Sequence, residues 1–282
     1  MYNLLKKGLI TVSDIEQIFS PQYKHPRQKE MFVTYIRLRI KASFNRWFHF
    51  KREHFLSYQV EFPDYEIFFS TFRQVFVRHA YYVDCSATEP VIVDCGGNIG
   101  MSVLYFKYLY PKAHITVFEP SREVLPSIRK NIALNTPDVT LIEKAVSDTD
   151  GTATMHSRGA AACGNTLTIG VGLQAEKSSG EKYEVPTVRL SPFIPEVVDI
   201  LKLDIEGSEG GVLREIEKAG ALTRIRAVVM EYHEMPHSKE NQLSEIISIL
   251  EKNDWLVEPF SEDIHTTYSL SLRTKAKKTT GN

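Results

Sequence analysis

The sequence lacks the features that would place the chain across a membrane or in an oxidising compartment. It has no run of about 18 apolar residues, and its first residues, MYNLLKKGLITVSD, lack the long apolar core of a signal peptide. The three cysteines, Cys85, Cys95 and Cys163, are odd in number and do not have the spacing of metal ligands. We therefore expect reduced thiols in a soluble, cytoplasmic protein.

A strong net charge is also missing. The 282 residues carry a formal net charge of -1, and 43% of them are hydrophobic, as in soluble globular proteins. The positive charge is unevenly distributed, because residues 24–53 hold nine Lys or Arg and only two acids. We expect a small-molecule partner and no nucleic acid, and the sequence leaves the oligomeric state open.

Residues 1–58 are predicted to form a helical extension. Apolar side chains recur every four residues, which is typical of one helix face, at Phe32, Ile36, Ile40, Phe44 and Phe48. Arg37, Lys41 and Arg46 fall on other faces. We expect this stripe to pack on the rest of the protein, although a basic, aromatic helix could instead make peripheral contact with an anionic membrane.

The most informative run is VIVDCGGNIG, residues 91–100. It reads as a short strand that ends in an acid, followed by a glycine turn that lets the backbone approach a ligand. A second strand, His114–Phe118, ends in Glu119, whose carboxylate could accept both hydroxyl protons of a ribose. Together the two strand ends indicate a nucleoside ligand.

The acid before the glycine turn favours S-adenosylmethionine over NAD. A dinucleotide usually requires glycines in the spacing G-x-G-x-x-G, whereas this turn carries Gly96, Gly97 and Gly100. Asp94 would repel a pyrophosphate but would suit the ammonium and sulfonium groups of S-adenosylmethionine. The predicted cofactor is therefore S-adenosylmethionine.

From Pro90 onward, predicted strands and helices alternate, which indicates a mainly parallel sheet with crossover helices. Before that point, residues 58–69 read as a β-hairpin leading into a helix near 71–78. We expect a catalytic domain over residues 59–274 and a disordered basic tail over 275–282. A loop rich in glycine, alanine and serine interrupts the alternation at residues 157–182 and is expected to be functional or mobile. The predicted strands are residues 91–95, 114–118, 139–145, 183–188, 200–204, 227–232, 255–260 and 267–272, and the helices are 101–109, 122–134, 208–218 and 241–252.

Five segments in this order resemble the FkbM family of S-adenosylmethionine-dependent methyltransferases. They are VIVDCGGNIG, VFEP, EKAVSDTDG, ILKLDIEGSEGGVL and VVMEYH, and the similarity covers about residues 65–273. The resemblance implies a class I methyltransferase fold, α/β and Rossmann-like, with a seven-stranded, mainly parallel sheet and helices on both faces. It also implies methylation of hydroxyl groups on sugars or natural products.

The resemblance implies roles for individual residues. Those expected to bind the methionine end and the ribose are Asp94, Gly96, Asn98, Gly100 and, for the ribose, Glu119. Ala145 and Val146 would flank the adenine, and Asp204 would lie beside the sulfonium. Leu190-Ser191-Pro192 departs from the Leu-Asp pair that family members often carry, so the acceptor is less transferable than the chemistry.

Four residues at the carboxyl ends of two strands are the candidates for catalysis: Asp204, Glu206, Glu231 and His233. We expect His233 to be the general base, because an ordinary histidine pKa of about 6.5 allows proton uptake near neutrality. Glu206 is expected to bind acceptor hydroxyls, and Glu209 to be a solvated helix residue. These four side chains could also bind a metal, but we expect none.

The predicted function is O-methylation of a small hydroxylated acceptor, most consistent with a sugar, a glycan or a natural product. Three alternatives remain open from the sequence. They are an N-methyltransferase of the same fold, an NAD-dependent sugar-modifying oxidoreductase and a binding module without catalytic activity.

Overall fold

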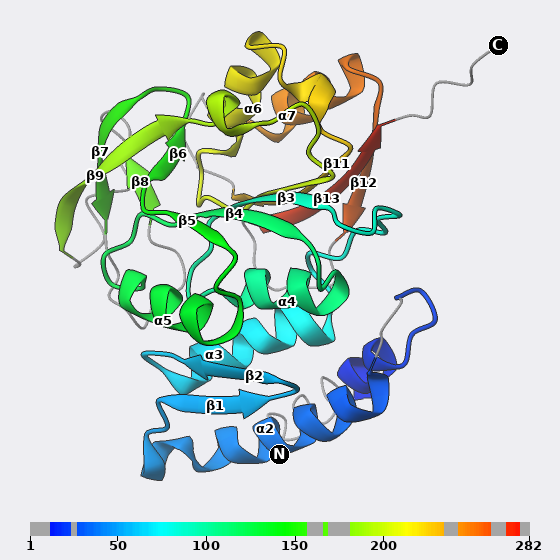
Figure 1. Cartoon of the computed structure of the whole chain (residues 1–282), viewed down its shortest axis with the longest axis vertical. Helices are drawn as coiled ribbons and strands as arrows, with labels where there is room; N and C mark the ends of the chain where they lie inside the picture. Colours follow the sequence, from blue (N-terminus) through cyan, green and yellow to red (C-terminus); the bar gives the residue numbers. More distant parts are fainter. Residues whose placement is uncertain are drawn as a thin grey trace.

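A seven-stranded sheet forms the centre of the computed structural model, which describes residues 12–23, 27–156, 166–168, 181–233, 242–260 and 269–276 (Figure 1). The five strands from β11 to β5 are parallel, and β13 pairs antiparallel with both β11 and β12. In sheet order the strands are β12 (Trp255–Phe260), β13 (Ser269–Ala276), β11 (Ala227–His233), β10 (Ile200–Leu203), β3 (Val91–Cys95), β4 (His114–Phe118) and β5 (Thr140–Ile142).

Helices cover both faces of this sheet (Figure 1). One face carries α4 (Met101–Leu109) and α5 (Leu125–Asn135), and the other carries α6 (Glu209–Lys218) and α7 (Leu243–Lys252). Side chains alternate between the faces along each strand, so that neighbours on β3, Ile92 and Val93, belong to different buried clusters. The predicted alternation of strands and helices is therefore confirmed for the core of the chain.

A separate four-stranded sheet lies beside the central one and was not predicted. Its order is β6 (Ala145–Ser147), β9 (Lys182–Arg189), β7 (Gly151–His156) and β8 (Thr166–Thr168). The single strand predicted over residues 139–145 is wrong, because β5 pairs with β4 in the central sheet whereas β6 pairs with β9 in the second sheet. Most of the loop predicted over residues 157–182 lies outside the described residues.

The N-terminal part combines helices with a hairpin. Helix α2 (Gln28–Phe48) is followed by β1 (Arg52–Phe55) and β2 (Tyr58–Glu61), which pair antiparallel. The prediction that residues 1–58 are helical is therefore wrong for β1, and the expected boundary at residue 58 cuts this hairpin. The buried cluster below the sheet contains residues of both parts, so the extension shares a core with the catalytic domain.

The second strand that was predicted after Pro63 is instead a helix, α3 (Tyr65–Phe72), which continues into the π-helix Arg73–Val77. Asp64 caps it, because its Oδ1 accepts hydrogen bonds from the backbone N–H groups of Glu66 and Ile67 at 2.8 and 3.1 Å. At the other end of the chain, β13 continues to Ala276, so the predicted tail from Lys275 begins too early.

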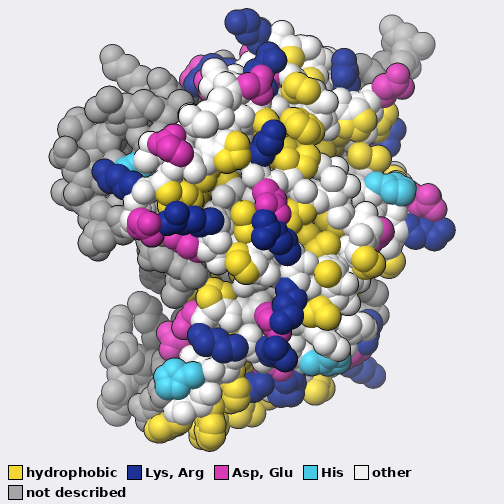
Figure 2. Space-filling model, turned by 60° about the vertical axis from the view of Figure 1, so that its left-hand side comes forward, with side chains coloured by type: hydrophobic (Ala, Val, Ile, Leu, Met, Phe, Trp, Pro, Cys, Tyr) yellow, Lys and Arg dark blue, Asp and Glu magenta, His cyan; other side chains and the backbone are white. Residues whose placement is uncertain are grey.

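The face that α2 buries differs from the predicted stripe. Met31, Tyr35 and Leu38 are fully buried, whereas Ile40 is 56% exposed. Figure 2 shows hydrophobic side chains gathered at the lower end of the molecule, the level at which α2 lies in Figure 1. The expectation that the whole stripe packs on the protein is therefore wrong. Its exposed members, together with a neighbouring tryptophan, are Ile40, Phe44, Trp47 and Phe48.

We expect Ile40→Asp to change the free energy of unfolding by less than about 1 kcal/mol, as is usual for an exposed position. The matched variant Leu38→Asp places a carboxylate at a fully buried site and should cost about 3 kcal/mol or more. Denaturant unfolding of both variants checks this difference. Equal losses of stability would contradict the assignment of the buried face.

The described part of the chain contains no helix that is long and apolar enough to span a membrane. Cys85 and Cys95 are free thiols, and Cys163 lies outside the described residues.

Candidate active site

A pocket opens at the carboxyl ends of the central parallel strands, the usual ligand site of an open α/β sheet. It contains about 670 Å³ of empty space, open solvent included. Its walls come from the loops after β3, β4 and β10 and from β6 and β7 of the second sheet. The lining residues are Gly96, Asn98, Phe118, Glu119, Pro120, Ser121, Val124, Lys144, Ala145, Val146, Met155, Asp204, Ile205 and Glu206.

Most residues predicted to bind the cofactor line this one pocket. These are Gly96, Asn98, Glu119, Ala145, Val146 and Asp204. Asp94 and Gly100 are absent from its wall. The pocket therefore brings together residues that lie more than one hundred positions apart in the sequence.

The turn after β3 requires glycine at position 96. Gly96 has a φ of +91°, and a Cβ atom there would lie 1.9 Å from the backbone oxygen of Asp204. No side chain fits in so short a gap. The glycine thus allows the end of β3 to lie directly against the end of β10.

Glu119 is a buried carboxylate that orders the opposite wall. Its Oε2 accepts the backbone N–H of Asn98 at 2.7 Å, and its Oε1 accepts that of Ser121 at 2.8 Å. Burial raises the pKa of Glu119 to about 7, although these two hydrogen bonds favour the ionised form. Each oxygen keeps a second lone pair, so the carboxylate can still accept ligand hydroxyl groups.

Asp94 has a different environment from the one predicted. It is completely buried, accepts a hydrogen bond from the Ser102 hydroxyl at 2.5 Å and pairs with the Lys202 ammonium at 3.1 Å. Burial raises the pKa of the Asp94 carboxyl despite the nearby Lys202 charge. Asp94 was predicted to bind the methionine end of the cofactor. In the structure it contacts Lys202 instead and does not line the pocket.

Lys202 is a buried cation to which the sequence analysis gave no role. Its Nζ donates to the carbonyl of Gly96 at 2.8 Å and lies 3.7 Å from Asp204 Oδ2. Burial alone would lower the pKa of Lys202, but the charges of Asp94 and Asp204 raise it overall. A lysine inside the otherwise apolar strand ILKL was a usable signal, because an interior strand position needs a partner for such a charge.

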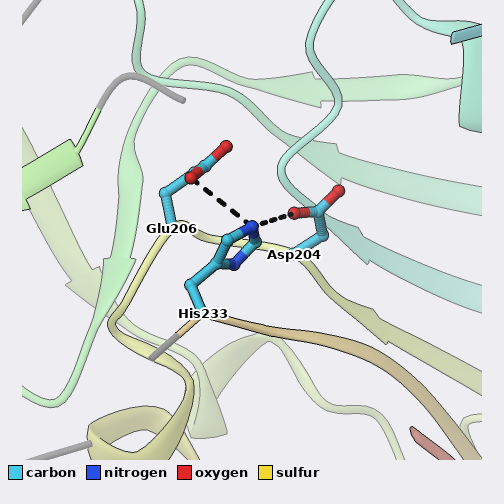
Figure 3. Close-up of side chains that lie close together, drawn as sticks. All are labelled: Asp204, Glu206 and His233. Atoms are coloured by element: carbon cyan, nitrogen blue, oxygen red, sulfur yellow. Dashed lines mark ion pairs between the residues drawn. The ribbon is translucent and has the colours of Figure 1, made fainter. Parts of the chain in front are cut away.

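The four predicted catalytic residues converge on His233. Figure 3 shows three of them, Asp204, Glu206 and His233. Its Nε2 is 3.5 Å from Glu206 Oε2, 3.8 Å from Glu231 Oε1 and 4.0 Å from Asp204 Oδ1. We call Asp204, Glu206, Glu231 and His233 the His233 cluster. Asp204 and Glu206 also line the pocket, so the cluster and the pocket share a wall.

Glu209 is not the solvated residue that was predicted. It is fully buried, and its Oε1 lies 3.1 Å from His233 Nδ1. The same carboxylate accepts the backbone N–H of Gly207 at 3.0 Å, in the turn where Glu206 has a φ of +55°. Glu209 therefore fixes both the imidazole ring and the turn that carries Glu206.

The surroundings of His233 differ from the ordinary ones assumed when it was predicted to be the general base. Burial disfavours its charged form, but the hydrogen bond to Glu209 and the charges of Glu206 and Asp204 raise the pKa of His233 to about 10. Without a bound ion the imidazole thus holds its proton near neutral pH. For the Glu231 carboxyl the effect of burial has the opposite sign. Burial raises its pKa to about 7, with a further contribution from the charge of Asp204.

Two side chains from the segment between β2 and β3 orient the cluster, and the sequence analysis did not predict them. The Tyr81 hydroxyl donates to Asp204 Oδ2 at 2.7 Å, and Gln74 Nε2 donates to Glu231 Oε2 at 2.9 Å. Neither residue belongs to a motif, and no periodicity in the sequence points to them. Only the packing of the segment between β2 and β3, which contains both residues, against the sheet brings them to the site.

The FkbM methyltransferase domain matches residues 94–255, more than half of the chain, from the end of β3 to the start of β12. The chain belongs to the FkbM methyltransferase family. The assignment confirms the predicted class of enzyme, a methyltransferase that uses S-adenosylmethionine, on an α/β fold.

Individual relatives of the FkbM family are distant. The 31-O-demethyl-FK506 methyltransferase FkbM of Streptomyces tacrolimicus is 29% identical over 66% of this chain and 81% of its own length. Methyltransferase 1 of Beauveria bassiana is 27% identical over 51% of this chain, and the match spans 66% of that relative, just under two thirds. The crystal structure of a methyltransferase FkbM from Methylobacillus flagellatus is 12% identical and has a TM-score of 0.47, covering 97% of this chain and 60% of that one.

Proposed function

We propose that the protein transfers a methyl group to a hydroxyl of a small acceptor, a sugar, a glycan or a natural product. The observation that carries this proposal is that Asp204 and Glu206 belong both to the pocket lining and to the His233 cluster. Carboxylates that can accept a proton would therefore lie beside the bound cofactor. The name of the relative from Streptomyces tacrolimicus, a 31-O-demethyl-FK506 methyltransferase, supports an oxygen acceptor.

The residues that line the pocket have the chemistry that S-adenosylmethionine needs. The Glu119 carboxylate would bind the ribose hydroxyls, and Ala145 and Val146 would provide an apolar surface for the adenine. The close approach at Gly96 leaves backbone groups rather than a side chain facing the methionine end. When bound, S-adenosylmethionine supplies a methyl group that its positive sulfur makes electrophilic.

The His233 cluster would manage the acceptor. Glu206 is the most exposed of its carboxylates, at 30%, and is the group we propose to bind the acceptor hydroxyl. A carboxylate of the cluster accepts the proton that the hydroxyl gives up, while His233 and Glu209 hold the geometry. Alignment of the acceptor and exclusion of water supply the rest of the rate enhancement.

A methyl-transfer assay tests this proposal directly. Protein and isotope-labelled S-adenosylmethionine would be incubated with a panel of hydroxylated sugars and natural products and with matched amines. Label transferred to oxygen is the expected result. Transfer to the amines alone would establish the N-methyltransferase alternative, and no transfer despite tight cofactor binding would favour a binding module.

We expect Glu119→Gln to weaken S-adenosylhomocysteine binding by about 1–3 kcal/mol, the range for hydrogen bonds to a charged group. The variant keeps the shape of the side chain but loses acceptor capacity on one oxygen. Calorimetry measures the change, with the exposed Glu89→Gln as a matched control. An unchanged affinity in a folded variant would move the ribose away from Glu119.

The pKa of Glu119 makes the same interaction sensitive to pH. Below its pKa of about 7 the carboxyl is protonated, and only the ionised form accepts hydrogen bonds on both oxygens. The affinity of the wild-type protein should therefore rise between pH 6 and pH 8, and that of Glu119→Gln should stay flat. A flat profile for the wild-type protein would contradict this role.

A further inference from the structure

Three side chains of the His233 cluster have the arrangement of a metal site. Asp204, Glu206 and His233 each offer one ligand atom, and these atoms lie within 4.8 Å of one another. Figure 3 shows both carboxylates turned toward the same ring nitrogen. Nε2 is 3.5 Å from Glu206 Oε2 and 4.0 Å from Asp204 Oδ1, longer than good hydrogen bonds. Ligands about 2.1 Å from one ion lie about 3–4 Å apart, so these gaps match a shared cation.

Two of these side chains, His233 and Asp204, are held from behind by a further group. Glu209 accepts from Nδ1 of His233, the contact that usually orients a metal-binding histidine. Tyr81 donates to the outer oxygen of Asp204, and its partner contact leaves Oδ1 facing the imidazole. Three parts of the fold thus position the ligand atoms. They are the loop after β10, the end of β11 and the segment before β3 that contains Tyr81.

The charges around this point also favour a cation. Three carboxylates, from Asp204, Glu206 and Glu231, surround one imidazole nitrogen within 4.0 Å. Lys202 lies on the far side of Asp204, 3.7 Å from Oδ2, and also neutralises Asp94. Among the described residues, the side of the cluster away from Lys202 therefore carries more carboxylates than cationic side chains.

We propose that Asp204, Glu206 and His233 bind a divalent cation of the Mg²⁺ or Mn²⁺ class at the boundary between the cofactor pocket and the acceptor. Two carboxylate oxygens suit a hard ion of this class, and the imidazole nitrogen favours Mn²⁺ over Mg²⁺, because imidazole is a ligand of first-row transition metals. Three protein ligands leave positions for the acceptor oxygen and water. This replaces the expectation that the protein uses no metal. The use of the ion in catalysis rests on the proposed O-methyl transfer. The ion would bind the acceptor hydroxyl and lower its pKa, and the hydroxyl would release its proton to the Glu231 carboxylate.

Binding of Mn²⁺ tests the site without a methyl donor or an acceptor. Titration of the wild-type protein at pH 8, followed by electron paramagnetic resonance, should show about one ion per chain. The electron spin echo should carry modulation from one coordinated ¹⁴N nucleus, as a single histidine ligand requires. Failure of O-methyl transfer would leave this result untouched, so the two proposals are tested separately.

The variants identify the ligands. His233→Ala should remove the nitrogen modulation and weaken Mn²⁺ binding by about 100-fold or more. Glu209→Gln, which keeps all three ligands but alters the group that orients His233, should weaken it roughly 10- to 100-fold. Glu245→Gln, at a surface pair with Arg214, should bind like the wild type.

Two results would overturn the proposal. One is the absence of stoichiometric Mn²⁺ binding to the folded wild-type protein, which would mean that a proton alone occupies the space at Nε2. The other is wild-type binding without nitrogen modulation, which would place the ion elsewhere. Because both results come from the wild-type protein, a variant that fails to fold does not rescue the proposal.

Discussion

Asp204→Asn should lower kcat by about 10²- to 10³-fold, the range seen when one preorganised electrostatic group is removed from an active site. The substitution keeps the size of the side chain and removes its charge. Asp204 lines the pocket proposed for the cofactor, and its Oδ1 lies 4.0 Å from His233 Nε2, so its charge acts on both the pocket and the His233 cluster. Steady-state kinetics measures the loss, and calorimetry with S-adenosylhomocysteine separates it from weaker binding.

The matched control for this prediction is Asp150→Asn. Asp150 is 55% exposed and pairs with Arg189 on the second sheet, away from the pocket wall. Its removal should leave kcat within about twofold, as expected for a surface pair that contributes little. Near wild-type turnover by Asp204→Asn would remove Asp204 from the catalytic residues.

Lys202→Met should destabilise the fold by about 3–5 kcal/mol, the usual cost of removing one partner of a buried ion pair. Methionine fills much of the same volume but leaves Asp94 buried without its cation. The lost hydrogen bonds to the carbonyls of Cys95 and Gly96 should also loosen the turn beneath the cofactor. Denaturant unfolding measures the change in free energy.

A double variant separates lost charge pairing from lost packing. Adding Asp94→Asn to Lys202→Met removes the unpaired charge and should recover part of the stability. Lys112→Met, at a surface position where the lysine side chain is 73% exposed, should have little effect. A double variant less stable than Lys202→Met would contradict the ion-pair explanation.

Local patterns predicted the parts of the fold that depend on local chemistry. The strand VIVDC, the glycine turn and helix α4 lie at the predicted residues, because a short β-branched run, a glycine turn and a following proline mark their boundaries locally. The end of the second strand predicted Glu119, and the family resemblance supplied Ala145 and Val146; the three share a pocket although they come from different strands. Their contact depends on strand order, which spacing alone does not determine.

Long-range packing explains what the sequence did not reveal. Glu209 looked like a solvated helix residue, yet the turn at Gly207 and the ring of His233 enclose it. The pKa of His233 depends on carboxylates whose proximity only the fold creates. On α2 two apolar stripes compete, and the tertiary contacts bury Met31, Tyr35 and Leu38 instead of the longer aromatic series.

The contacts of Tyr81 and Gln74 have a practical consequence for dissecting the enzyme. A fragment that starts at residue 84 would retain every position of the family match, 94–255, yet it would lose the donors to Asp204 and Glu231. Exchanging the segment before residue 84 between relatives would therefore change the hydrogen bonds to Asp204 and Glu231 without altering the matched domain. Variants designed to accept other substrates should keep or vary this segment together with the domain.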